Sequence, residues 1–88
     1  MSEKKFFMII LVKERENVAV KIQELLTKYG CIIKTRLGIH DVVKDKCSNV
    51  GSIILELFSE KLENLYKLEA ELNSVKGVKA KLIDMEID

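Results

Sequence analysis

Arg36, Gly38 and His40 are the residues of this 88-residue chain whose types and spacing most clearly suggest chemistry. They alternate along an extended segment, so they share one face of a strand in steps of roughly 6.6 Å. By this alternation we expect that face to lie away from the helices. A guanidinium and an imidazole on either side of a glycine would suit a small anion, or a metal with an anionic ligand. The alternatives are a solvated edge arginine, a bulge at Gly38 and a histidine that only ends its strand.

A second group of polar residues lies at the start of the charged segment 41–49 and within it: His40, Asp41, Asp45 and Cys47. Imidazole and thiolate are ligands of zinc, iron and nickel, and carboxylates can complete such a shell. The spacing matches no standard metal motif and the chain has one histidine. An ordinary charged hairpin loop is therefore the expectation for a single chain, and a site shared across a dimer interface stays open.

The candidate site follows from these two groups. The ligand or cofactor stays unknown, with a transition metal as one option. The expected ligand-binding residues are Arg36, Gly38, His40 and Cys47, and the expected metal ligands are His40, Cys47 and Asp41.

Cys31 is separated from this site by distance. It begins the extended segment nine residues before His40, which is about 30 Å along a strand. The two cannot bind one metal within one chain, and the same distance disfavours a disulfide with Cys47. Alternation places Cys31 toward the helices, where a buried cysteine behaves as a small hydrophobic side chain.

Hydrophobic periodicity predicts the elements that position these residues. One helix is expected over 18–29, with Asn17 as its N-cap and Gly30 as its C-cap. A leucine stripe predicts a second helix between Ser59 and Gly77. Short segments rich in bulky and β-branched residues predict four strands: 5–12, 31–40, 52–58 and 78–87.

The order strand, helix, strand, strand, helix, strand is the split β-α-β pattern. It predicts an α+β, ferredoxin-like βαββαβ fold in one domain spanning 1–88, with two helices on one face of a four-stranded antiparallel sheet. The first and third strands are apolar at nearly every position, which suits the centre of the sheet. The second and fourth strands carry lysines and an arginine, which suits its edges.

The first strand is apolar on both faces, and both helices lie on one side of such a sheet. The other face has nothing in this chain to cover it, and an exposed apolar patch of that size marks an interface. We therefore expect a homodimer or homotetramer. In the last strand the apolar positions switch after Leu82 to Ile83, Met85 and Ile87. The switch suits an end packed on another chain, although a bulge or a frayed tail is an equal alternative.

Composition limits the classes of function. The net charge is +1 and the charged residues are scattered rather than grouped, which argues against direct nucleic-acid binding. The first apolar run is too short to span a bilayer, so we expect no membrane association and a cytoplasmic protein with its cysteines as thiols. The chain has no CxxC, no glycine-rich phosphate loop and no nucleophile with a second histidine. We therefore expect a binding protein, not an enzyme.

The segment from Thr35 to His40, the loop and apolar strand that follow, and the ending Val75-Lys76-Gly77-Val78-Lys79 resemble small regulators of the iron-only hydrogenase system. The resemblance covers nearly the whole chain. It implies a ferredoxin-like fold similar to ACT domains and to the C-terminal domain of nickel-responsive repressors, which assemble through their sheets and sense small ligands or metals. Arg36 and Gly38 match pattern positions, whereas His40 stands where such regulators often have proline.

Two departures limit what the resemblance implies. The chain lacks the ribbon-helix-helix segment of nickel repressors, and it lacks the glycine that ACT domains often place after their first strand. The leading hypothesis is a self-associating regulatory or sensing module with a ligand or metal site on the second strand and the following loop. The alternatives are an interaction subunit that docks another protein without a ligand, and a small enzyme that uses His40 or Cys47.

Overall fold

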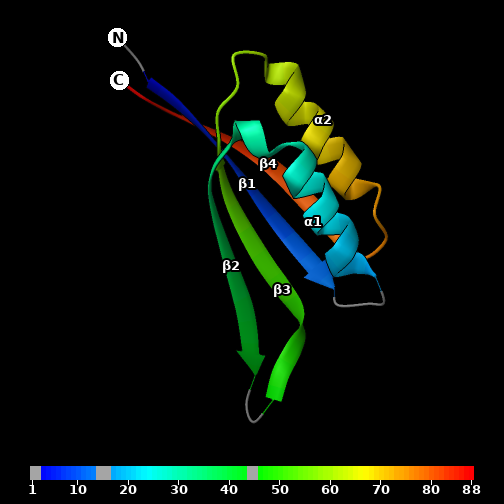
Figure 1. The fold of residues 1–88 in the computed structure, drawn as a ribbon. Coiled ribbons are helices and arrows are strands. Elements are labelled where there is room, and N and C mark those ends of the chain that lie inside the picture. The colour runs from blue at the N-terminus through cyan, green and yellow to red at the C-terminus, as the bar shows by residue number, and fades with distance from the viewer. Residues whose placement is uncertain (1–2, 14–16, 44–45) are drawn as a thin grey trace.

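The computed structural model describes residues 3–13, 17–43 and 46–88, and within them the side chains of all residues except 39–49. The chain forms a four-stranded antiparallel sheet in the order β2-β3-β1-β4. Both helices lie on one face of this sheet (Figure 1), which confirms the predicted fold. The elements in chain order are β1 (Glu3–Lys13), α1 (Val18–Lys28), the short 3-10 helix η1 (Gly30–Ile32), β2 (Ile33–Val43), β3 (Lys46–Leu57), α2 (Leu62–Asn73) and β4 (Val78–Ile87).

The core lies between the helices and the two central strands. Met8 and Ile10 of β1 pair with Leu55 and Ile53 of β3, and their side chains point toward the helices. Apolar residues three and four positions apart give each helix one buried stripe. The buried residues are Met8, Ile10, Val18, Ile22, Leu26, Leu55, Leu57, Leu65, Leu68, Leu72 and Ala80.

The helix ends differ from the sequence-based expectation. Asn17 precedes α1 in a left-handed conformation, with φ 68°, and makes no side-chain cap bond. The second helix begins at Leu62, and Ser59 supports the preceding turn by accepting a hydrogen bond from the Lys61 amide at 3.1 Å. Gly77 lies beyond that helix in the turn into β4, where its φ of 90° favours glycine.

Two expectations about the second strand are wrong. Residues Gly30–Ile32 form a 3-10 turn, so the strand begins at Ile33 and Cys31 is an exposed thiol rather than a buried side chain. The segment 41–49 is mostly strand, because Val42 pairs with Cys47 and Val43 pairs with Lys46. The second and third strands thus form one long hairpin, which Figure 1 shows extending beyond the helices.

A register shift near the start of β2 decides which way its side chains point. Ile33 pairs with Leu57, yet Thr35 pairs with Glu56, so Lys34 is an extra residue in this strand. Such a bulge reverses the alternation for the residues that follow. Arg36 pairs with the buried Leu55 and therefore lies on the helix side of the sheet.

The other face of the sheet exposes apolar side chains, as the sequence predicts. Ile9 is 39% exposed and Leu11 is 46% exposed, although both belong to the central strand β1. Leu37 joins them from β2 because of the bulge, and Met85 and Ile87 join them from β4. No helix covers this open face (Figure 1), which we call the open sheet face below.

A polar contact links the two helices at one end of the core. Lys28 Nζ of α1 donates a hydrogen bond to Oε1 of Glu71 in α2 at 3.0 Å. The nearby Tyr29 hydroxyl and then the Lys28 ammonium, which donates to Oε1, lower the pKa of Glu71 by favouring its carboxylate form. The same contact raises the pKa of Lys28.

The contact between Lys28 and Glu71 predicts that the free energy of unfolding falls as the pH becomes acidic. The lowered pKa of Glu71 means that its carboxylate stabilises the fold above the ordinary value of 4.5, and that this contribution is lost as the pH falls. Glu71→Gln should therefore make stability less dependent on pH on the acid side, as measured by urea denaturation at pH 6 through 3. Glu24→Gln, which removes an exposed carboxylate from α1, should leave the dependence close to that of the original protein. Equal curves for all three proteins would show that the contact contributes nothing.

Candidate functional site

Arg36 connects β2 to the first helix. Its Nη1 donates a hydrogen bond to Oε1 of Gln23 in α1 at 2.9 Å. The sequence-based expectation that Arg36 lies on the face away from the helices is therefore wrong, and the extra residue at Lys34 is the cause. Arg36 remains exposed, so its guanidinium keeps donors available to other groups.

Gly38 lies on the same helix side, one step further along β2. It pairs with Ile53 and is exposed. A Cβ atom added at Gly38 would meet nothing within 4 Å, and its backbone is not in the left-handed region. The fold thus needs neither the small size nor the flexibility of glycine here. The absence of a side chain leaves open the surface beside Arg36.

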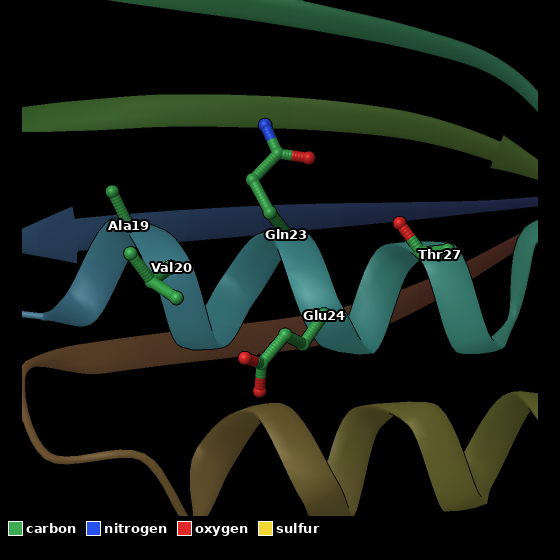
Figure 2. Close-up of a pocket in the computed structure, with 5 residues that line it drawn as sticks. All are labelled: Ala19, Val20, Gln23, Glu24 and Thr27. Atoms are coloured by element: carbon green, nitrogen blue, oxygen red, sulfur yellow. The ribbon is translucent and has the colours of Figure 1, made fainter.

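A depression of about 520 Å³ lies along the exposed side of α1. Figure 2 shows its lining residues: Ala19, Val20, Gln23, Glu24 and Thr27. The Gln23 side chain extends toward the strands, whereas Glu24 extends toward the second helix. Gln23 therefore joins this depression to Arg36. One helix alone does not enclose a ligand, so the depression can serve only as one wall of a site.

For the other predicted site residues, the structure gives only the position of the backbone. His40 pairs with Gly51 and Cys47 pairs with Val42, with a register shift between these two pairs. The structure does not describe the side chains of His40, Cys47 and Asp41. Asp45 lies wholly outside the described residues. Within the described residues no three His, Cys, Asp or Glu side chains gather closely enough to hold a metal. The metal hypothesis thus stays a prediction that depends on the end of the long hairpin.

Gln23 is the residue of this site that sequence reasoning misses. It lies on the polar side of α1, where a glutamine carries no signal of its own. Its partner could have been found only by knowing that a bulge turns Arg36 toward the helices.

Residues 5–82 match the family described as "TM1266-like: Iron-only hydrogenase system regulator, putative". The chain belongs to this family. The resemblance seen in the segment 35–40 and in the ending around Gly77 is thereby confirmed. No curated protein matches the chain.

Solved structures support the same fold. The uncharacterized protein TM1266 from Thermotoga maritima is 27% identical, with a TM-score of 0.76 over 94% of this chain and 99% of that one. The ACT domain of GTP pyrophosphokinase from Chlorobium tepidum is 18% identical, with a TM-score of 0.66 over 94% and 100%. CPII from Thiomonas intermedia K12, solved with ADP, AMP and acetate, is 11% identical, with a TM-score of 0.61 over 100% and 92%. The last two are similar in fold alone.

The helices of the described residues are all too short or too polar to span a membrane.

The open space around Gly38 allows a test of whether the fold requires glycine at this position. Glycine within a strand costs roughly 0.5–1 kcal/mol relative to alanine, and a Cβ at this position meets no neighbour. Gly38→Ala should therefore raise the free energy of unfolding by about that amount, measured by urea denaturation. Gly77→Ala should lower it, because Gly77 has a φ of 90°. A loss of stability in Gly38→Ala would mean that the fold itself requires this glycine.

Proposed function

We propose that this protein is a regulatory or sensing module that self-associates through its open sheet face and binds a small ligand near Arg36, Gly38, His40 and Cys47. The ligand is a small anion, or a metal ion that carries an anionic ligand. The observation that supports this proposal most is the Arg36 guanidinium, which Gln23 holds beside the unfilled surface of Gly38.

The charge of Arg36 supports an anionic ligand. Among the described residues its hydrogen-bond partner is the neutral amide of Gln23, and no carboxylate forms an ion pair with it. By contrast, Lys34 of the same strand lies 3.6 Å from Glu56. A guanidinium presents several donors in a plane and pairs well with carboxylate or phosphate. The amide of Gln23 orients it without neutralising its charge.

The two proposed surfaces lie on opposite faces of one sheet. Arg36 and Gly38 lie on the helix side, whereas Leu37 between them lies on the open sheet face. A ligand that changes the position of β2 on one side would therefore change the surface that a second copy meets on the other. Regulation would follow as a population shift, in which the ligand favours one assembly state.

The family supports a regulatory role over catalysis. The chain belongs to a family of regulators, and its solved neighbours include an ACT domain and a nitrogen regulatory PII-like protein. No catalytic step is assigned to His40 or Cys47 in this proposal. The open sheet face would equally suit a different protein partner, so the interaction-subunit hypothesis remains the second candidate.

Binding is tested with defined ligands on the full-length protein. We expect phosphate, acetate, Zn²⁺ or Ni²⁺ to raise the melting temperature, and native mass spectrometry of protein purified without chelator to show retained mass. Arg36→Ala and His40→Ala should each weaken binding by roughly tenfold or more, because a charge-assisted contact contributes on the order of 1.5–3 kcal/mol. Gly30→Ala, a change at another glycine with open space around it, is the matched control. Retention of full binding in both Arg36→Ala and His40→Ala would refute the site.

Self-association is tested by a charge on the open sheet face. Ile9→Glu should convert an oligomer to a monomer in light scattering coupled to size-exclusion chromatography, because it buries an unpaired carboxylate in the interface. Val20→Glu places the same charge on the exposed side of α1, where the side chain is 58% exposed, and should leave the oligomer intact. A monomeric original protein would contradict self-association and favour docking of a different partner.

A further inference from the structure

Side chains of α2 hydrogen-bond the backbone along the first half of the outer edge of β4. The Ala80 amide donates a hydrogen bond to Oδ1 of Asn73 at 2.7 Å, and Nδ2 of Asn73 donates one to the Ala80 carbonyl at 2.9 Å. The Leu82 amide donates to Oε2 of Glu69 at 2.7 Å. Asn73 thus bonds Ala80 as a neighbouring strand would, and no further strand can pair with this half of the edge.

The second half of the edge has no such cover. Backbone groups of an antiparallel strand point alternately toward each neighbour, and β4 pairs with β1 without a register shift. Since the groups of Ala80 and Leu82 point outward, those of Asp84 and Glu86 point outward as well. In the ranges that the structure describes, no side chain bonds the outward amides of these two residues. Figure 1 shows that β4 diverges from α2 as it runs toward the C-terminus.

The two sides of this open edge differ in chemistry. Met85 is 62% exposed and Ile87 is 72% exposed, and both lie with Ile83 on the open sheet face. Asp84 and Glu86 lie on the other side and are exposed. Lys4 pairs with Asp84 at 3.4 Å, while Glu86 forms no ion pair within the described set, so an acidic excess remains.

The opposite edge of the sheet is protected in a different way. β2 has register shifts at both of its ends, and its helix side carries the basic Arg36. Bulges and charged side chains are the usual devices that discourage pairing at an edge. The segment from Ile83 to Ile87 has no bulge, and its outward-bonding residues carry only acidic charges, from Asp84 and Glu86. These acids disfavour an acidic partner but leave the backbone open to a strand of opposite charge.

We propose that the outer edge of β4 from Ile83 to Ile87 binds an extended segment of a partner protein in which basic and apolar residues alternate. Strand addition would satisfy the outward backbone groups of Asp84 and Glu86. The basic side chains would face these two carboxylates, and the apolar ones would extend the surface formed by Ile83, Met85 and Ile87. A second copy pairing β4 with β4 places acidic residues beside one another, which disfavours that occupant.

The test uses a seven-residue peptide of alternating Lys and Val with the full-length protein, and a Glu and Val peptide as its control. We expect the Lys peptide to slow hydrogen exchange of the Asp84 and Glu86 amides by roughly tenfold at saturation. The Glu peptide should have no such effect. Glu86→Pro removes an outward N–H without breaking a bond to β1, and it should abolish the protection of Asp84. Glu86→Gln keeps the amide and should weaken binding by several-fold through loss of charge.

Three results would overturn the proposal. One is an absence of protection in the original protein, and another is protection of Asp84 that persists in Glu86→Pro while circular dichroism shows a folded variant. The third is an association of the protein with itself that Glu86→Pro removes, which would assign the edge to a second copy. None of these outcomes depends on the ligand site at Arg36, so failure here and failure there are distinguishable.

Discussion

The structure depends on one imbalance: the central strand β1 is apolar on both faces over residues 6–12, but the two helices cover only one of those faces. Met8 and Ile10 pack beneath the helices, whereas Ile9 and Leu11 of the same strand stay exposed. Apolar burial is the main favourable term in folding, at roughly 25 cal/mol per Å², so an 88-residue domain leaves a substantial part of it unused. Contact with another protein chain would bury this exposed apolar surface. For that reason the proposed function includes self-association, and a ligand that moves β2 would change the surface that a second chain meets.

A single extra residue separates the two proposed surfaces. Without the bulge at Lys34, Arg36 would share the open sheet face with Ile9, and a guanidinium would lie among the exposed apolar side chains of that face. The bulge exchanges the two sides of β2, so that Leu37 joins the apolar surface and Arg36 reaches Gln23. An unpaired buried charge is costly, so the bulge would remove that cost from the proposed self-association. The same bulge thus places the proposed ligand site and the proposed interface on opposite faces of the sheet.

The sequence predicts the order of elements and the central strands well because those properties follow from strong and repeated signals. Two-sided apolar strands such as β1 must lie at the centre, and the leucine stripe of α2 has one interpretation. The orientation of Arg36 was predicted wrongly because period-2 alternation contains no information about a one-residue insertion. Cys31 was misplaced for a related reason, since a 3-10 turn and a first strand residue look alike at the sequence level. The roles expected of His40 and Cys47 remain predictions.

The edges of the sheet show the limit of sequence reasoning in another way. Asn73 and Glu69 occupy exposed-looking positions of an amphipathic helix, where polar residues are expected for solubility alone. Only the three-dimensional arrangement shows that both bond the backbone of β4. Since a helix rises about 1.5 Å per residue and two strand residues span roughly 6.6 Å, a helical step of four matches a strand step of two. That match lets successive turns of α2 bond alternate residues of β4. The next helical step is Leu65, whose apolar side chain is buried in the core and cannot bond the Asp84 backbone. Beyond Leu82 the twisted β4 also diverges from α2 (Figure 1), so this small fold keeps an edge at which pairing remains available.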